Sequence, residues 1–374
     1  QVKKGLDKND DYTKKNSYFS NGYHCGYYFR QTCGTGSNES YARWNVVRGE
    51  HSMSKVKKKG RTMFIFSCIF AFIISFAGSV IFKMTYVSPR MKKYSVKWSD
   101  EIGEIYTDFS YGEKPANKFD LYVPKDNTKE NYGLIVYLHA GGFATGDKSD
   151  DAKMLQWLCS LGYVTAGINY TLFNEENPDA NVYTQSMEIK VSMPYIIEEA
   201  KKLGYNIDRM AMSGGSAGGC LALIYAYRDA DTSPVPVKMV FEGVGPSSFY
   251  PEDWKNYGFD QNAEAAAGLF SVMTGKTITP ELFGTPEHDE LVKDTSALYW
   301  VNENSVPTVM AYGMYDTFQP YEGSVRLDEK LTKYNVPHEY IVFEHSGHGL
   351  QNDNKQGVEY MEKIVEYLDR YMSE

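Results

Sequence analysis

The chain has few cysteines, and none of them has a spacing typical of a metal site or a disulfide framework. Five cysteines are spread over 374 residues, and only Cys159 and Cys220 lie in the part that we expect to fold. Both fall on predicted helices, where a small buried thiol is the favoured interpretation. The sequence therefore predicts no bound metal, no cofactor and no disulfide scaffold.

Positive charge is scarce in the larger, C-terminal part of the chain. Residues 1–97 contain 18 Lys and Arg and 5 Asp and Glu, whereas residues 98–374 contain 21 Lys and Arg and 43 Asp and Glu. The net charge of −9 is therefore the sum of a basic N-terminal part and an acidic C-terminal part. An acidic domain repels a phosphate backbone, and nucleic-acid binding is therefore not expected. The hydrophobic content of 42% is ordinary for a globular protein, and the length suits one large domain or two small ones.

A long apolar run lies near the front of the chain. Residues 63–82 are twenty consecutive uncharged residues, which is the length that a helix needs to cross a bilayer, and a basic cluster at 55–61 precedes them. This layout predicts a transmembrane signal anchor, or a signal peptide if the chain is cleaved near Ala77. With the basic cluster in the cytoplasm, the C-terminal domain is membrane-anchored and extracytoplasmic, or secreted after cleavage. The alternative is a buried core helix.

The segments on either side of this run show no sustained periodicity. Residues 1–62 are predicted to be disordered and basic. Met53 opens a stretch that begins as signal segments do, so we expect residues 1–52 either to lie outside the native protein or to form a disordered cytoplasmic tail. Residues 83–103 are expected to be a linker to a domain at 104–374.

From about residue 104 the chain alternates strand-like and helical patterns. Strands are predicted at 119–123, 134–139, 163–169, 209–213, 239–244, 308–312 and 340–343, and helices at 151–161, 185–203, 217–228, 324–334 and 357–371. This alternation indicates an α/β fold, in which a mostly parallel sheet carries helices on both faces and sites gather at the carboxyl ends of the strands. The stretch at about 246–300 breaks the pattern and is predicted to be a small cap insertion.

A glycine-rich turn around Ser216 carries the strongest chemical signal. It follows one predicted strand and opens an apolar helix, as the G-x-S-x-G nucleophile elbow does. A serine hydroxyl attacks only when a base removes its proton, and the turn must expose it. Gly214 and Gly218 are expected where side chains would collide across the turn. A phosphate-binding loop is disfavoured because no Lys follows and the GxGxxG spacing is absent.

A second glycine pair follows the strand predicted at 134–139. Gly141 and Gly142 can present backbone N–H groups to the oxyanion that forms when a serine attacks an ester, and Ala217 can supply a third. We therefore predict an oxyanion hole from these three amides. His139, just before the pair, is interpreted as a structural brace for the loop rather than as the catalytic base.

The remaining candidates follow the last two predicted strands. Asp316 comes after strand 308–312 and His348 after strand 340–343, which gives the order Ser, Asp, His along the chain. In this scheme His348 is the base and Asp316 orients it. His345 competes for the role of base, and the flanking glycines at 347 and 349 favour His348. No carboxylate or further His joins the pair to suggest a metal.

These motifs together resemble the α/β-hydrolase superfamily. The resemblance covers residues 104–372 and is closest to its esterase and lipase branch, which contains hormone-sensitive-lipase-like and bacterial acetyl- or feruloyl-esterase-like enzymes. It is carried by HAGGF at 139–143 with GDK at 146–148, INY at 168–170, GGSAGG at 214–219, GMYD at 313–316 and HSGHG at 345–349. The resemblance implies an eight-stranded sheet and carboxylesterase activity.

The expected function is therefore a serine carboxylesterase that uses Ser216, His348 and Asp316. Its expected substrate is a small-acyl ester, either a small molecule or an ester linked to a polysaccharide. Two alternatives remain: a serine peptidase of the prolyl-oligopeptidase kind, and a non-catalytic binding module that has kept the fold. The oligomeric state is left open by the sequence.

Overall fold

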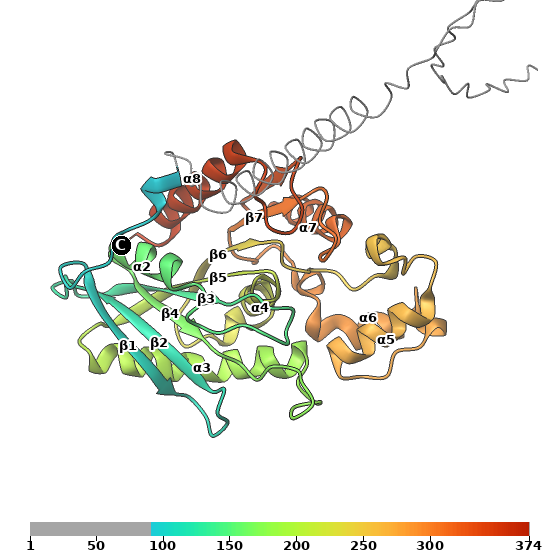
Figure 1. Cartoon of the computed structure of the whole chain (residues 1–374), viewed down its shortest axis with the longest axis horizontal. Coiled ribbons are helices and arrows are strands. Elements are labelled where there is room, and N and C mark those ends of the chain that lie inside the picture. Colours follow the sequence, from blue (N-terminus) through green and yellow to red (C-terminus); the bar gives the residue numbers. More distant parts are fainter. Residues whose placement is uncertain (1–90, 374) are drawn as a thin grey trace, which may run out of the picture. The chain divides into compact units, whose positions relative to one another are not determined.

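The computed structural model describes residues 91–373, and these are built around one eight-stranded sheet (Figure 1). The strand order is β1-β2-β4-β3-β5-β6-β7-β8. β2 pairs antiparallel with both β1 and β4, and every other pair is parallel. The strands are β1 (Gly103–Ser110), β2 (Lys118–Pro124), β3 (Tyr132–Leu138), β4 (Val164–Ile168), β5 (Ile207–Gly215), β6 (Val237–Gly243), β7 (Thr308–Gly313) and β8 (His338–Phe343). The expected eight-stranded, mostly parallel sheet is confirmed.

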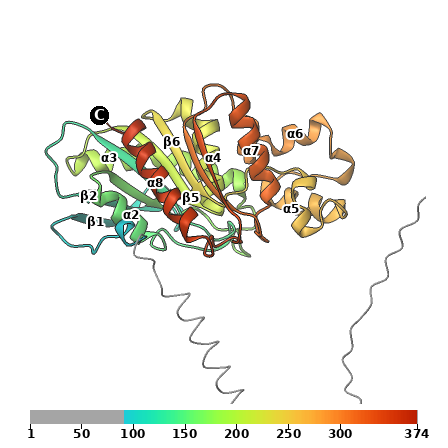
Figure 2. The same ribbon diagram turned by 90° about the horizontal axis from the view of Figure 1, so that it is seen from above.

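Helices cover both faces of this sheet. α2 (Ala152–Ser160) and α8 (Asn354–Tyr371) pack on one face, whereas α3 (Val182–Lys202), α4 (Ala217–Ile224) and α7 (Tyr321–Lys333) pack on the other (Figure 2). Strand β3 shows why: Ile135 belongs to the core under α2 and α8, while its neighbours Leu134 and Val136 belong to the core under α3 and α4. Successive side chains of a strand point to opposite faces, so an all-apolar strand needs cover on both.

Strand β1 is the one strand that the sequence pattern did not predict. Most of its side chains are exposed or half-buried, so it has neither the continuous apolar run nor the clean alternation of a buried strand. It lies at the edge of the sheet, and its register with β2 shifts between Tyr106 and Phe109. Asp108, inside this irregularity, has a φ of 63°.

The stretch between β6 and β7 is helical. It holds α5 (Ala263–Thr274) and α6 (Pro286–Val292) together with short 3-10 turns. The Arg326 side chain of α7 anchors it by donating to both carboxylate oxygens of Asp253, at 2.9 and 2.7 Å. The 3-10 turns of this stretch are Pro251–Asp253, Lys255–Tyr257, Pro280–Leu282, Lys293–Thr295 and Ala297–Trp300.

Three further short elements complete the described chain: a 3-10 turn at Met91–Tyr94, a π turn at Tyr225–Asp229 that continues α4, and a 3-10 turn at Ala230–Thr232. The predicted membrane segment at 63–82, the segment 1–62 before it and the linker up to residue 90 lie outside the described residues. Within 91–373, no helix combines the length and the apolar character needed to span a bilayer.

Candidate active site

Ser216 occupies a strained turn between β5 and α4. Its φ of 53° and ψ of −120° lie outside the regions that a side-chain-bearing residue normally adopts. The surrounding backbone holds it there: the Ser216 N–H donates to the Gly243 carbonyl at 2.8 Å, and its own carbonyl accepts from the Cys220 N–H at 3.0 Å. Strain of this kind persists only where neighbouring structure fixes it, and it is found preferentially at functional sites.

The two glycines that flank the turn leave no room for a side chain. A β-carbon on Gly214 would lie 2.5 Å from the carbonyl carbon of Gly218. A β-carbon on Gly218 would overlap the carbonyl group of Leu138 at the end of β3. Helix α4 can therefore begin directly against two strands, and this close approach aims Ser216 at the carboxyl edge of the sheet.

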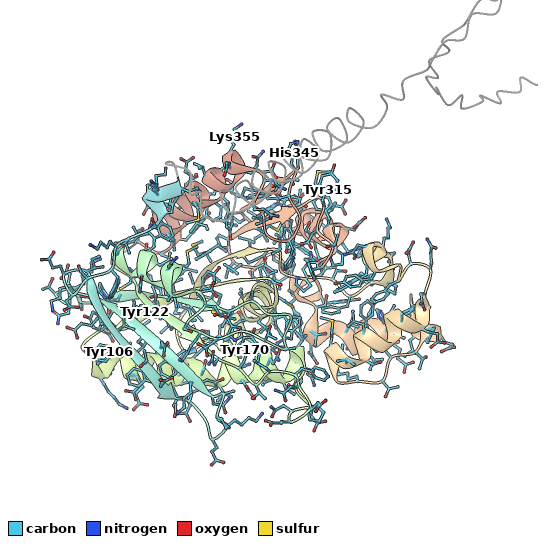
Figure 3. All side chains as sticks on the ribbon, viewed as in Figure 1. Tyr106, Tyr122, Tyr170, Tyr315, His345 and Lys355 are labelled. Carbon is cyan, nitrogen blue, oxygen red and sulfur yellow. The ribbon has the colours of Figure 1, made fainter. Side chains whose placement is uncertain are left out.

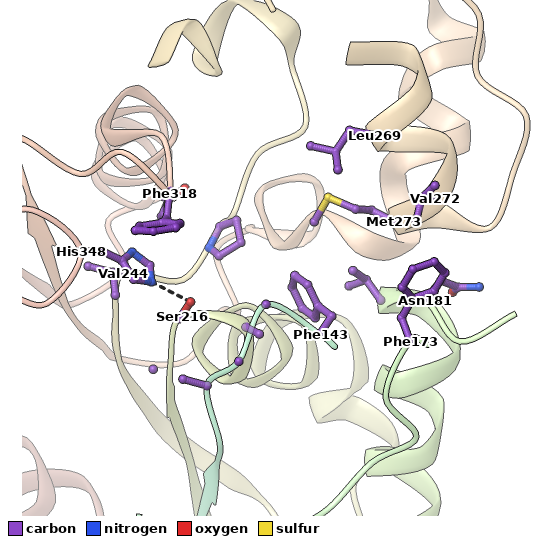
Figure 4. Close-up of a pocket in the computed structure, with 18 of the residues that line it drawn as sticks. Phe143, Phe173, Asn181, Ser216, Val244, Leu269, Val272, Met273, Phe318 and His348 are labelled. Carbon is purple, nitrogen blue, oxygen red and sulfur yellow. Dashed lines mark hydrogen bonds between the residues drawn. The ribbon is translucent and has the colours of Figure 1, made fainter. Parts of the chain in front are cut away.

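Three side chains that are distant in sequence meet at this edge. His348 Nε2 lies 2.8 Å from Ser216 Oγ, and His348 Nδ1 lies 2.7 Å from Asp316 Oδ2 (Figure 4). A carboxylate can only accept, so Nδ1 carries the hydrogen and Nε2 is left as the acceptor for the Ser216 hydroxyl. The structure thus brings together the three residues that the sequence motifs singled out.

The carboxylate of Asp316 is itself fixed by the backbone. Its Oδ1 accepts from the N–H groups of Phe318 and Gln319 at 2.8 and 2.9 Å, and the side chain is almost fully buried. The ring of Phe318 lies 5.4 Å from that of His348, centroid to centroid. With one oxygen held by two amides, the other is directed at His348.

His345, the competing histidine, lies away from this group. Its Nδ1 is 2.8 Å from Asp353 Oδ1, and its side chain is 74% exposed. Figure 3 shows it at the outer edge of the molecule. Its geometry suits a surface contact with the start of α8 and gives it no access to Ser216.

Gly141 and Gly142 border the cavity that contains Ser216. Both have positive φ values, of 129° and 58°, and the Gly141 carbonyl accepts from the N–H groups of Ala144 and Thr145 in a tight turn. A β-carbon on Gly141 would overlap the Thr145 carbonyl, whereas one on Gly142 would meet nothing within 4 Å. Ala217, the first residue of α4, also lines the cavity, and a helix offers its first N–H groups no partner. Gly141, Gly142 and Ala217 therefore line the same cavity as Ser216.

His139 supports the loop that carries these glycines. Its ring is buried and stacks on Tyr170 with 4.3 Å between centroids and 8° between planes. Tyr170 Oη donates to the His139 carbonyl at 2.9 Å, and burial lowers the pKa of His139. This packing fits the bracing role expected from the sequence.

A buried lysine provides a second support that sequence reasoning missed. The Lys148 ammonium lies 3.0 Å from Asp108 and 3.1 Å from Asp120, on the two antiparallel strands at the sheet edge. Its backbone N–H donates to Asn169 Oδ1 at 2.6 Å, and Asn169 Nδ2 donates to Asp147 at 2.7 Å. The only available signal was the GDK segment at 146–148, which belongs to the motifs that carry the resemblance.

A buried carboxyl that no sequence motif includes lies beneath the turn. Glu242 in β6 is fully buried; its Oε2 accepts from the Gly245 N–H at 2.8 Å, and its Oε1 has no hydrogen-bond partner among the described residues. Burial raises the pKa of Glu242 to about 8. A β-carbon on Gly219 would lie 2.9 Å from this carboxyl, so Glu242 packs against the first turn of α4. A Glu directly after the apolar run at 239–241 was the available signal.

The cavity above Ser216 has a volume of about 730 Å³ and is walled mostly by apolar side chains (Figure 4). None of the residues that line it is Asp, Glu, Lys or Arg. Over residues 91–373, no cluster of three or more His, Cys, Asp or Glu is arranged to hold a metal ion. The side chains of the lining that can take part in proton transfer and nucleophilic attack are those of Ser216 and His348.

This fold and site define an α/β-hydrolase of the esterase and lipase branch. The family model BD-FAE matches residues 119–331, more than half of the chain, and the chain belongs to this family. The match includes Ser216 and Asp316 and ends before His348.

Curated relatives match at low identity. Esterase LipC of Mycobacterium tuberculosis is 22% identical over 251 residues, which are 64% of this chain and 58% of the relative. An acetyl esterase of Salmonella schwarzengrund is 31% identical over 108 residues, which are 28% of this chain and 31% of the relative. The chain thus spans less than two thirds of the length of these relatives.

Solved structures share the fold. Esterase B of Lactobacillus rhamnosis superposes with a TM-score of 0.56 at 18% identity and covers 80% of this chain and 94% of its own. A truncated carbohydrate esterase from gut microbiota gives a TM-score of 0.54 at 17% identity and covers 73% of this chain and 98% of its own. These similarities show a common architecture.

Proposed function

We propose that the chain is a serine carboxylesterase in which Ser216 is the nucleophile. The observation that carries the proposal is the continuous hydrogen-bonded path from Ser216 Oγ through His348 to Asp316, beside the backbone amides of the glycine loop. The names of the family's relatives agree with it, since LipC and the Salmonella protein are both called esterases.

In the first half of the reaction, Ser216 Oγ attacks the ester carbonyl while His348 Nε2 takes the hydroxyl proton. The carbonyl oxygen becomes an oxyanion, which accepts hydrogen bonds from the N–H groups of Gly141, Gly142 and Ala217. Asp316 stabilises the imidazolium. When the tetrahedral intermediate collapses, the bond to the alcohol breaks, His348 returns its proton to the leaving alkoxide, and an acyl-serine ester remains.

In the second half, water replaces the alcohol. His348 Nε2 takes a proton from the water, whose oxygen attacks the acyl carbon, and the same amides hold the second oxyanion. Collapse breaks the bond to Ser216 Oγ, which recovers the proton from His348, and the carboxylic acid is released. No external oxidant, reductant or metal enters this balance.

The proposal is tested with Ser216→Ala, His348→Ala and Asp316→Asn in the full chain. We expect each to lower kcat on p-nitrophenyl esters by about 10³- to 10⁶-fold, because the three groups act as one unit. His345→Ala is the matched control and should keep nearly full activity. A fluorophosphonate probe should label Ser216 alone; turnover by Ser216→Ala, or a label on another serine, would exclude this nucleophile.

The same assay separates the alternatives. A peptidase would cleave proline-containing peptides in preference to esters, and a binding module would hydrolyse neither. Neither alternative has support from the comparisons, in which the relatives reported above are named as esterases. Acetylated xylan in the same panel tests the polysaccharide-linked substrate, for which the name of the gut-microbiota carbohydrate esterase is the support.

A further inference from the structure

We infer that the cavity beside Ser216 is an acyl-binding pocket for an uncharged, apolar chain much larger than acetyl, such as hexanoyl or octanoyl. This inference rests on the proposed esterase function and names its substrate class. The sequence motifs led us to expect a small acyl group. The motifs contain only the reacting groups, whereas the size of the acyl group depends on the cavity that receives it.

The cavity is large, and its walls are mostly apolar. The volume of about 730 Å³ is shared by the acyl and alcohol halves of an ester and falls within the range that encloses most of a drug-sized ligand, so an acetyl ester of a small alcohol would leave much of it unfilled. Its far wall is made by Leu269, Val272 and Met273 of α5, and Phe143 and Phe173 face them (Figure 4). A sugar or carboxylate placed here would lose its hydration without gaining partners.

The few polar side chains of the lining already have partners. Asn181 caps α3, with its oxygen accepting from the Thr184 N–H at 3.0 Å and its amide donating to the Asp179 carbonyl at 2.9 Å. Tyr257 Oη donates to the Phe318 carbonyl at 2.8 Å. These groups stabilise the walls and are not directed at a polar ligand.

Several apolar side chains of the lining are left unusually exposed. Phe173 and Val272 are 38% and 49% exposed, and Phe318 beside His348 is 67% exposed. A cluster of exposed apolar side chains around a cavity is typical of a ligand site, because a bound apolar chain removes this surface from water.

The chemistry of the triad decides which half of the ester lies in this pocket. His348 must return its proton to the leaving alkoxide, so the alcohol lies on the His348 side of the reacting carbon. The acyl substituent then points the other way. Figure 4 shows Leu269, Val272 and Met273 across the cavity from the pair of Ser216 and His348. The acyl chain therefore runs toward α5.

The expected effect follows from the burial of methylene groups. Each methylene transferred from water to an apolar wall contributes up to about 0.8 kcal/mol, which is about fourfold in kcat/KM. Incomplete burial reduces this slope, so we expect at least a tenfold rise in kcat/KM from acetyl to hexanoyl esters with a constant p-nitrophenol leaving group.

The experiment measures the octanoyl-to-acetyl ratio of kcat/KM for the full chain and two variants. Leu269→Trp fills the far wall and should lower this ratio at least tenfold. Ala263→Trp is the matched control, since it adds the same ring at the exposed start of the same helix, outside the cavity lining, and should leave the ratio unchanged. A wild-type ratio of one or less, a preference for succinyl esters, or an unchanged ratio in Leu269→Trp would overturn the inference.

Direct binding distinguishes a failure of the pocket from a failure of the proposed function. Ser216→Ala is titrated calorimetrically with N-methyloctanamide and with N-methylacetamide, which need no turnover. At least tenfold tighter binding of the octanamide supports the pocket even if no ester is hydrolysed, in which case the esterase proposal alone fails. Equal binding of the two amides overturns the pocket whatever the outcome of the kinetics.

Discussion

The buried carboxyl of Glu242 predicts a specific dependence of stability on pH. Glu242→Gln keeps the shape of the side chain and an oxygen for the Gly245 N–H, and it removes the ionisable proton. Glu242 is fully buried, and the loss of hydration on burial raises its pKa from 4.5 to about 8. The folded protein therefore holds the proton through neutral pH, whereas the unfolded chain releases it near pH 4.5.

The sign follows from this difference in proton binding. Between pH 4.5 and 8 the folded state binds one proton more than the unfolded state, so the free energy of unfolding falls as the pH rises through this window. The limiting slope is about 1.4 kcal/mol per pH unit, and it levels off above the folded pKa. From pH 6 to pH 9 this gives a loss of about 2.5 kcal/mol from Glu242, which Glu242→Gln should not show.

The neighbouring titratable groups do not obscure this effect. Tyr312 is fully buried near Glu242, Tyr137 and Tyr360 are partly buried there, and the loss of hydration raises the pKa of each well above its ordinary value. Burial likewise raises the pKa of the Cys220 thiol. These groups stay neutral to pH 9, so no other buried charge appears beside Glu242 in the window.

The assay is urea unfolding of the full chain at pH 6 and pH 9, with Glu175→Gln on an exposed loop as the control. From pH 6 to pH 9 we expect the free energy of unfolding of Glu242→Gln to rise by about 2.5 kcal/mol relative to that of the wild type. Parallel stability profiles for wild type and Glu242→Gln across this range would refute the raised pKa.

Two further predictions concern the segment between β6 and β7. Arg326→Met removes the two charged hydrogen bonds of the buried Asp253 carboxylate. Because Arg326 is itself part-exposed, we expect the free energy of unfolding to fall by only about 2 kcal/mol, which a lower Tm would show. An unchanged Tm would contradict the anchoring role. His288 is fully buried and neither ring nitrogen has a hydrogen-bond partner among the described residues, so His288→Leu should raise stability by about 1 kcal/mol. Burial lowers the pKa of His288, so the wild type should also lose stability as the pH falls below 6.5. Denaturant unfolding at pH 7.5 and pH 5 measures this loss, which His288→Leu should not show.

The sheet could be predicted because its strands carry local signals. The seven predicted strands and five predicted helices all have counterparts, with bounds that differ by a few residues. Strand β1 was missed because pairing with β2 stabilises it, and its own side chains are mostly exposed. A strand that is stabilised mainly by pairing with its neighbour need not show a hydrophobic periodicity in its own sequence.

The reacting groups could also be predicted, for a topological reason. Ser216, Asp316 and His348 each follow a parallel strand, and the carboxyl ends of parallel strands lie along one edge of a sheet. The order of strands β5 to β8 then brings residues 132 positions apart into hydrogen-bonding distance. Their supports, Lys148 and Glu242, depend on partners from other strands, which no single motif contains.

The pocket could not be predicted, because its walls come from an insertion whose periodicity is ambiguous. In α5, Ala266 and Phe270 are buried in the core of the segment, while Leu269 and Val272 face the cavity and stay partly exposed. In the sequence all four are simply apolar residues of one helix, and hydrophobic periodicity does not distinguish a face that meets protein from a face that meets a ligand. The type of reaction is therefore encoded locally, in short motifs at strand ends, whereas the size of the substrate is encoded by which apolar side chains the fold leaves uncovered. Acyl preference can for that reason change by substitutions in α5 that leave every motif of the triad intact.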